Sequence, residues 1–373
     1  MHSKKEQWLI LVLFCGFLAG MAAMYLCLPK GDFSSREKRY LAEPPVLTWE
    51  SLSEGDFSGD VETYMADHIP GRSFFVGLNA YFDLLTGRQG AKDILLTEDR
   101  RLVEAPAAWD EAAVQKNMDT INAFAKGAGV PVDLMIVPSA GWAAEEKIRG
   151  LSAPYEDEAI IGSIYALAEE TVRTVDVLSV FDQTDAPELL YYKTDHHWTS
   201  LGAYTACRSY AGGLGKSYPA AEDFTVETVP GFYGSTYSRS ALWLTPGEEI
   251  QLWHGAENIT VTRGADEAPH QGIFFRNRLE EEDKYTVFLD GNHPLVRLHN
   301  PEQEGQGKLL VIRDSFSNCL GGFLAEAFEE VVLVDLRYYR QPVSQLLQEG
   351  FDRVLVCYSI GNFLTDTNII WLR

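Results

Sequence analysis

Hydrophobic residues first gather at the N-terminus, in the run WLILVLFCGFLAGMAAMYLCL at residues 8–28. These 21 residues carry no charged side chain. A helix rises ~1.5 Å per residue, so about 20 apolar residues cross the ~30 Å hydrocarbon core of a bilayer. The pattern predicts a transmembrane anchor at 8–28 behind a short flank at 1–7. A cleavable signal peptide, with its shorter apolar region and small residues such as Ala22 and Ala23, is the alternative.

The charges beside this span do not favour an external C-terminal domain. Lys4 and Lys5 precede the span, and four basic residues follow it: Lys30, Arg36, Lys38 and Arg39. The positive-inside rule counts Lys and Arg near the ends of a span, so the count opposes that orientation. Residues 29–56 are polar and contain prolines, which is typical of an extended tether.

After the tether, the hydrophobic spacing predicts a folded domain over 57–373. Apolar residues at helical spacing predict helices at 61–85, broken at Pro70-Gly71, and at 109–129. Between them, DILLTEDRRLVE at 93–104 is typical of a hairpin around Asp99.

Strand and helix patterns alternate in the rest of the domain. VPVDLMIVPSA at 130–140 is a continuous apolar run typical of a buried parallel strand, and a helix at about 156–170 and a strand at 172–181 follow it. Three further strands, KLLVI, VVLVDL and RVLVCYS, alternate with helices near the C-terminus. This order predicts an α/β fold with a parallel sheet and right-handed crossovers. Residues 222–306 hold short β-type runs between Gly, Pro, Asn and Asp, and predict a mostly β insertion.

Composition narrows the classes of partner. The chain has 31 Lys and Arg against 54 Asp and Glu, a net charge of −23. Phosphate binding needs a basic surface, so nucleic acid is excluded as a partner. Cys15 and Cys27 lie in the apolar span, and the other three cysteines are too far apart for a disulfide scaffold or a CxxC zinc site. No cofactor is predicted.

Two motifs carry the candidate chemistry. Asp195, His196 and His197 are consecutive in YYKTDHHWTS, and Ser315 follows a predicted strand in VIRDSFSN. In open α/β sheets, functional groups collect at the carboxyl ends of strands. A serine hydroxyl becomes nucleophilic when a histidine accepts its proton, and a carboxylate fixes the tautomer of that histidine. The two motifs are compatible with such a triad, whereas helix N-capping is the alternative role for Ser315.

The residues TDHHW, a following GAY-containing helix and a late DSFS turn resemble the DHHW protein family of bacterial envelopes. They are also similar to the SGNH-hydrolase-like domain of the alginate O-acetylation proteins of the AlgX and AlgJ type. The segments FSSREKRYLAEPP, YMADHIPGR, MIVPSA, VDLRYYR and DRVLVCYS extend the resemblance over most of the chain after the span. The resemblance implies that Asp195 orients the base His197 and that Ser315 is the nucleophile, in an order permuted relative to ordinary SGNH hydrolases. His196 falls at the variable middle position.

The resemblance implies an SGNH-hydrolase-like parallel sheet flanked by helices, and a serine O-acetyltransferase or acetylesterase. Its substrate would be an extracellular or cell-wall polysaccharide, and a membrane-embedded acyltransferase would supply the acyl group. The domain would then lie outside the cell on a single-pass anchor. Arg337 and Asn362, at later strand ends, are expected to contact the oxyanion or the substrate, together with Trp198 and Tyr192.

Two other functions stay open from the residues alone. A metal site needs three or four converging ligands, but adjacent histidine side chains diverge and the remaining histidines lack ligand spacing, so no metal is predicted. The alternative function is a non-catalytic glycan-binding or scaffold protein of an exopolysaccharide modification complex, because aromatic rings can stack on sugars. The aromatic candidates for this role are Tyr191, Tyr192, Trp198, Tyr233, Tyr237, Trp243 and Trp253. The presence of Asp195, His197 and Ser315 together favours the enzyme.

Overall fold

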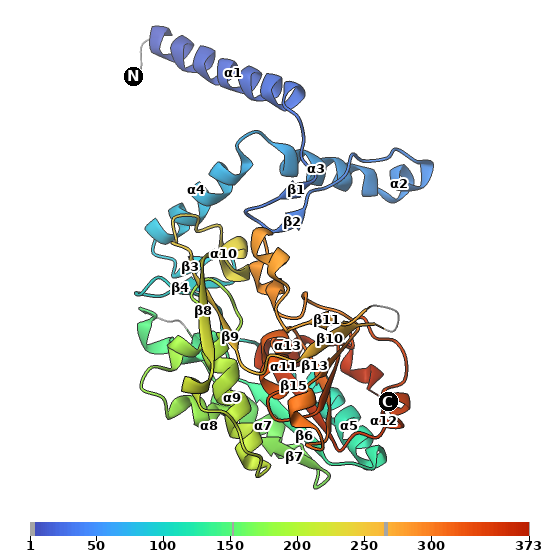
Figure 1. Ribbon diagram of the computed structural model, residues 1–373. Coiled ribbons are helices and arrows are strands. Elements are labelled where there is room, and N and C mark those ends of the chain that lie inside the picture. The colour runs from blue at the N-terminus through green and yellow to red at the C-terminus, as the bar shows by residue number, and fades with distance from the viewer. Residues whose placement is uncertain (1–3, 151–152, 265–267, 373) are drawn as a thin grey trace. The chain divides into compact units, whose positions relative to one another are not determined.

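The computed structural model describes residues 4–150, 153–264 and 268–372, and it divides into two compact units (Figure 1). Unit 1 runs to Ala91 and takes in Ala241–Trp243, and unit 2 holds the other described residues. The division at residue 91 differs from the predicted domain start at residue 57. Residues 1–3 of the predicted flank lie outside the described residues.

Unit 1 begins with α1 (Lys4–Cys27), a helix of 24 residues that is long and apolar enough to cross a membrane. Its bounds overlap the predicted span at 8–28. Three more helices follow: α2 (Trp49–Glu54), α3 (Asp56–His68) and α4 (Arg72–Leu85). The break between α3 and α4 falls at Pro70-Gly71, where the sequence predicted it.

The predicted tether at 29–56 contains regular structure, so its description as an extended segment was wrong. The short strands β1 (Phe33–Ser34) and β2 (Arg39–Tyr40) pair as a hairpin before α2. The buried carboxylate of Asp67 on α3 binds the Arg39 guanidinium and accepts the Ala42 backbone N–H at 2.9 Å. These contacts join residues about 25 positions apart, which local composition does not reveal.

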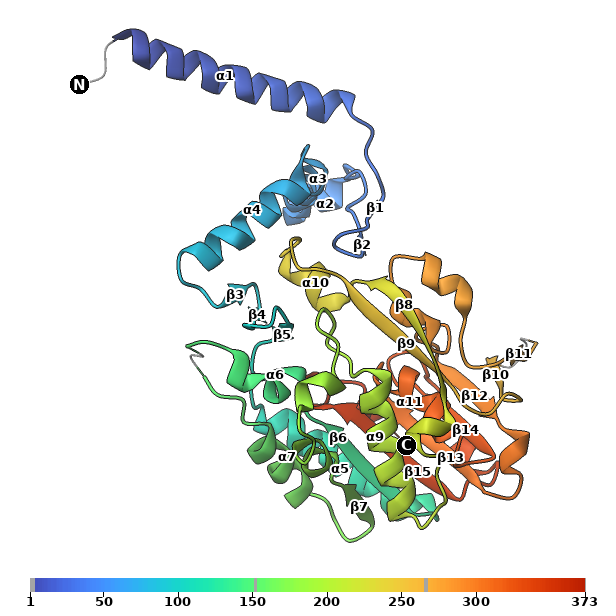
Figure 2. The ribbon, with the colours of Figure 1, turned by 60° about the vertical axis from the view of Figure 1, so that its left-hand side comes forward.

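Unit 2 is organised by a sheet that has eight strands in its described part, in the order β11-β10-β12-β14-β13-β15-β6-β7 (Figure 2). The five strands from β14 to β7 are parallel, and β12, β10 and β11 continue the sheet in antiparallel pairing. The strands are β6 (Val132–Val137), β7 (Val172–Val175), β10 (Thr260–Arg263), β11 (His270–Gln271), β12 (Leu295–His299), β13 (Lys308–Arg313), β14 (Glu330–Val334) and β15 (Arg353–Ser359). The predicted α/β fold with a mostly parallel sheet is confirmed.

Helices cover both faces of this sheet because alternate residues of each buried strand point to opposite sides. Met135 and Val311 pack with residues of α9 and α11 in one hydrophobic cluster. Leu134 and Ile312 pack with residues of α5 and α13 in the other. The helices of unit 2 are α5 (Glu111–Ala128), α6 (Ala140–Ala143), α7 (Asp157–Ala166), α8 (Val177–Asp182), α9 (Ser200–Gly213), α10 (Ser235–Ser240), α11 (Ser317–Leu324), α12 (Val343–Leu347) and α13 (Ile360–Thr365).

The hairpin predicted around Asp99 is present as β4 (Ile94–Leu96) paired with β5 (Leu102–Glu104). The predicted β insertion at 222–306 is less separate than expected, and its residues 265–267 lie outside the described residues. Among the described residues of this region, only β8 (Thr225–Phe232) and β9 (Glu248–His254) form a sheet of their own, whereas β10, β11 and β12 extend the main sheet. YTVFLD at 285–290 is one of the short β-type runs in this region, but it begins within the 3-10 helix η5 (Lys284–Val287).

Candidate active site

The loop that carries the two histidines is fixed at both ends. Tyr191 and Trp198 form an isolated antiparallel bridge, and the Thr199 N–H donates to the Leu190 carbonyl at 2.8 Å. Gly202 permits this close approach, because a Cβ there would lie 2.3 Å from the Leu190 carbonyl oxygen. The loop stands between η2 (Pro187–Leu190) and α9. It therefore follows a helical segment.

His197 lies between a carboxylate and a serine hydroxyl. Its Nδ1 is 2.5 Å from Asp195 Oδ1, and its Nε2 is 2.8 Å from Ser315 Oγ. All three side chains are buried. In the neutral imidazole one ring nitrogen donates and the other accepts. With the proton on Nδ1 toward Asp195, Nε2 can accept the proton of the Ser315 hydroxyl.

The Asp195 carboxylate is held in its ionised form. Burial alone would raise its pKa, but the His197 and His196 rings and hydrogen bonds outweigh that effect, so the pKa lies well below its usual range. The Ser235 backbone N–H donates to Asp195 Oδ2 at 2.7 Å, and the His197 N–H donates to Oδ1 at 2.9 Å. Gly234 makes room for the carboxylate, because a Cβ there would lie 2.4 Å from Asp195 Oδ2.

Ser315 stands in the turn between β13 and α11, and its hydroxyl contacts His197. The residue before it, Asp314, organises this turn. Asp314 Oδ1 accepts the Phe316 N–H at 3.0 Å, while Oδ2 accepts the Ser359 N–H at 2.8 Å, the Ser359 hydroxyl at 2.9 Å and the Asn362 amide at 2.7 Å. One carboxylate thus links the serine turn to the carboxyl end of β15 and the start of α13.

Tyr285 on η5 is a site residue that the sequence analysis missed. Its ring stacks on the His197 ring with centroids 3.9 Å apart and planes 9° apart. Its hydroxyl donates to the Ser315 carbonyl at 3.3 Å. Tyr285 therefore contacts both the predicted base and the predicted nucleophile. No motif marks it as a site residue, because it lies 30 residues before Ser315 in the run YTVFLD, whose pattern indicated only a strand.

Two predicted substrate contacts are buried in the core. Trp198 is fully buried, and its Nε1 donates to the Phe316 carbonyl at 3.0 Å. Tyr192 is buried against Phe232 and Tyr285. Neither ring has a face open to a sugar, so their prediction as substrate contacts was wrong. Trp198 instead links the histidine loop to the serine turn.

Arg337 and Asn362 each have a carboxylate partner. The Arg337 guanidinium donates to both oxygens of the buried Asp335, at 2.9 and 2.7 Å. This pairing opposes the predicted contact of Arg337 with an oxyanion. Asn362 lines the pocket described below, but its amide nitrogen is bound to Asp314. A contact of Asn362 with substrate stays a prediction.

A pocket of about 250 Å³ adjoins His196 and Phe316, the neighbours of His197 and Ser315. Its lining includes Ser139, Ser235 and Asn362. His196 is partly exposed, and its Nδ1 is 2.5 Å from the Ser235 hydroxyl. Burial and the nearby His197 lower the pKa of His196, which favours its neutral form. His196 therefore faces the pocket and is bonded to Ser235.

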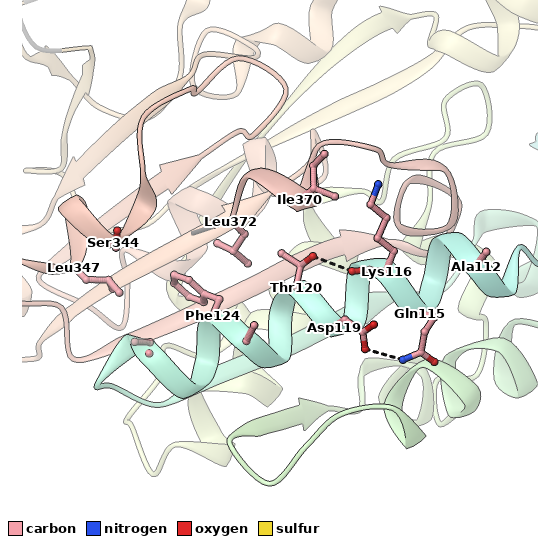
Figure 3. Close-up of a pocket in the computed structure, with 13 residues that line it drawn as sticks. Ala112, Gln115, Lys116, Asp119, Thr120, Phe124, Ser344, Leu347, Ile370 and Leu372 are labelled. Atoms are coloured by element: carbon pink, nitrogen blue, oxygen red, sulfur yellow. Dashed lines mark hydrogen bonds between the residues drawn. The ribbon is translucent and has the colours of Figure 1, made fainter.

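A larger pocket of about 750 Å³ lies along α5, away from these residues (Figure 3). Three of its polar side chains take part in hydrogen bonds within the helix: the Gln115 amide donates to Asp119 at 2.8 Å, and the Thr120 hydroxyl donates to the Lys116 carbonyl at 2.9 Å. Its apolar lining includes Phe124, Leu347 and Leu372. Because no nucleophile and base converge there, size alone does not make it the candidate active site.

Asp195, His196 and His197 also have potential metal-ligand atoms within 4.8 Å of one another. However, Asp195 Oδ1 and His197 Nδ1 already bind each other, and His197 Nε2 faces Ser315. A metal ion on these three residues would have to replace the contacts that orient His197. The arrangement fits proton transfer better than metal ligation.

Comparisons with known proteins bear on the family and the fold of the chain. The model of the DHHW protein family matches residues 106–334. The chain belongs to the DHHW protein family. The recognition of this family from TDHHW and DSFS is confirmed. No curated protein matched the chain.

Solved structures show that the fold is shared. A DHHW family protein from Eubacterium siraeum has a TM-score of 0.64 at 21% identity, covering 76% of this chain and 97% of that chain. Bacillus cereus PatB1 with a sulfonyl adduct has a TM-score of 0.64 at 22% identity, covering 75% and 98%. The O-acetyltransferase domain of Pseudomonas putida AlgJ is more distant, with a TM-score of 0.47 at 16% identity over 73% and 92%.

Because Asp314 accepts four hydrogen bonds, we expect Asp314→Asn to lower both the stability of the protein and its turnover. The amide nitrogen would face donors that now bind a carboxylate, and each buried group left unpaired costs about 1–3 kcal/mol. Misplacement of the serine by ~1 Å can lower turnover about 100-fold. We expect a lower melting temperature and at least a tenfold loss of esterase turnover. Asn362→Ala removes a single donor and should cost less in both measurements, and an Asp314→Asn variant with native stability and turnover would contradict this role.

Because the Tyr285 ring stacks on His197, we expect substitutions of Tyr285 to lower turnover only when they remove the ring. If His197 acts as the base, an imidazolium would form on it when it takes the serine proton, and an aromatic face stabilises a cation by about 0.5–2 kcal/mol. Tyr285→Phe keeps the ring and should keep most of kcat. Tyr285→Leu removes it and should lower kcat roughly 2- to 30-fold with little change in KM. Tyr204→Leu, which removes a buried tyrosine ring from the same hydrophobic cluster, is the matched core control. An equal loss of kcat in that variant would show that the Tyr285 ring acts only through packing.

Proposed function

We propose that this chain is a membrane-anchored SGNH-type serine acyltransferase that O-acetylates an extracellular or cell-wall polysaccharide, or an esterase that uses the same acyl-serine intermediate. The observation that carries the proposal is His197 placed between Asp195 and Ser315, at 2.5 and 2.8 Å. A buried serine, histidine and carboxylate in this order are suited to acyl transfer through a covalent intermediate.

The reaction begins when Ser315 Oγ attacks the carbonyl carbon of an acyl ester. His197 Nε2 accepts the hydroxyl proton, and the ionised Asp195 stabilises the resulting imidazolium. The ester bond then breaks, the leaving oxygen takes the proton from His197, and the acyl group remains on Ser315. A sugar hydroxyl or water attacks this acyl-serine while His197 accepts its proton, and Ser315 is released with its proton restored. The acceptor decides between transferase and esterase.

The family resemblance is the reason for proposing that the acyl group is an acetyl group and that its acceptor is a glycan. A pocket of about 250 Å³ suits a small acyl group with part of a sugar ring, since pockets for larger ligands measure ~300–1,000 Å³. The sulfonyl adduct of PatB1 also supports a reactive nucleophile, because sulfonyl compounds are electrophiles that nucleophiles capture. The same family resemblance is the reason for proposing a polysaccharide as the acceptor. It is also the reason for proposing a membrane-embedded protein that donates the acyl group.

A glycan-binding protein without catalysis is the second candidate function. The pocket rim would support it, because Glu104 and Arg239 form an ion pair there and could hydrogen-bond sugar hydroxyls. The contacts of Ser315 favour the enzyme, since binding alone needs no activated serine.

A sulfonyl fluoride should label Ser315 specifically. Intact-mass and peptide mass spectrometry of the protein should show one sulfonyl group on Ser315, with a parallel loss of activity toward a chromogenic acetyl ester. Because His197 activates the hydroxyl, His197→Ala should slow labelling by several orders of magnitude, whereas His196→Ala should leave much of it.

Two outcomes of this labelling experiment would contradict the proposal. Labelling that is equally fast in His197→Ala would show a hydroxyl that the histidine does not activate. Activity that a chelator abolishes and added Zn²⁺ restores would favour a metal site at Asp195, His196 and His197 instead.

The orientation of the anchor gives a separate prediction. We place unit 2 outside the cell, because a glycan acceptor and the family resemblance both require it there. Protease added to intact cells should therefore cut the domain while α1 stays in the membrane fraction. A domain that is digested only after lysis would be cytoplasmic, and the extracellular substrate would be excluded.

A further inference from the structure

Helix α4 exposes an apolar stripe. Phe74, Leu78, Phe82 and Leu85 recur at helical spacing and are 64%, 54%, 59% and 85% exposed. Residues at spacings of three and four lie on one face of a helix. Soluble helices normally turn such a face toward the core. The stripe is therefore suited to a partner outside the fold.

The opposite face of α4 is fixed within unit 1, so the stripe cannot turn inward. Gly77 and Ala80 are buried there. Trp243 packs on Gly77 so closely that a Cβ would lie 2.7 Å from its ring, and its Nε1 donates to the Ser73 carbonyl at 3.0 Å. The small residues and the tryptophan set the rotation of the helix about its axis.

The position of α4 along the chain brings it near a membrane surface. An apolar groove of about 700 Å³ is lined by Met21, Tyr25 and Leu26 from the end of α1, by Met65 from α3 and by Ile69 directly after α3. If α1 crosses the bilayer, as proposed above, its last turns lie at the bilayer surface, and α3 lies beside them. Only Ile69, Pro70 and Gly71 separate the end of α3 from the start of α4.

The charge of the segment around the stripe indicates which part of a bilayer the stripe would contact. Residues 29–91 contain ten Asp and Glu against six Lys and Arg, so anionic headgroups would repel this segment. The stripe itself contains no charged residue. Its attraction to a bilayer would come from apolar side chains entering the region between headgroups and acyl chains, as in interfacial helices.

We propose that α4 lies in the surface of the bilayer that α1 crosses, with Phe74, Leu78, Phe82 and Leu85 in contact with lipid. The helix would add a second membrane contact to the transmembrane anchor. The two contacts would restrict the orientation of unit 1 relative to the bilayer, which a single helix with a free linker could not do.

Site-directed spin labelling of the full chain tests this proposal. Cys15 and Cys27 are exposed and are replaced by alanine, while the other three cysteines are buried. Single cysteines then replace Leu78, Phe82 or, as the matched control on the polar flank of the same helix, Asn79. The labelled protein is placed in phosphatidylcholine vesicles. The accessibility of each nitroxide to oxygen, which dissolves in lipid, is compared with its accessibility to a water-soluble nickel chelate.

Lipid contact predicts that labels at 78 and 82 collide with oxygen more often than with nickel, and that the label at 79 shows the reverse. Phosphatidylglycerol in the vesicles should not strengthen the effect. High nickel accessibility at 82 would overturn the proposal, because the stripe would face water. Low accessibility to both reagents at 78 and 82 would also overturn it, because a protein surface would then cover the stripe. Neither result bears on catalysis at Ser315.

Discussion

The arrangement of the site depends on the burial of one ionised carboxylate, that of Asp195. Transfer of an isolated, ionised carboxylate from water into an apolar interior costs tens of kcal/mol. A buried carboxylate therefore needs hydrogen-bond donors around it. The His197 ring, the His197 backbone N–H and the Ser235 N–H supply these donors. Because the two backbone N–H groups hold the carboxylate in place, the carboxylate can fix the orientation of the imidazole.

A second carboxylate performs the equivalent task for the serine. Asp314 accepts bonds from the serine turn and from the end of β15, so the position of Ser315 follows from two strands of the parallel sheet. The Trp198 indole then connects the two halves through the Phe316 carbonyl. The distance between His197 and Ser315 is thus determined by contacts that lie outside the pair itself.

The sequence predicted the elements whose pattern is local. The strand and helix alternation, the break at Pro70-Gly71 and the family were all recognised, because each is carried by neighbouring residues. The sequence could not place Ser235 or Gly234 beside Asp195, since 40 residues separate Ser235 from the carboxylate that it binds. Trp198 was misjudged for a related reason: burial depends on the partner of its indole, which is 118 residues away. The same limit applies to Arg39 and Asp67, whose ion pair folds the segment that composition described as a tether.

A double-mutant cycle on Ser315 and His197 tests the central claim most directly, that the two residues act as one unit with Asp195. Turnover of a chromogenic acetyl ester is measured for Ser315→Ala, His197→Ala and the double variant, after circular dichroism has shown that all three are folded. Members of a catalytic unit have strongly non-additive effects. The account predicts that the double variant is about as slow as either single variant. Losses that multiply in the double variant would mean that Ser315 and His197 act independently, and would contradict the account.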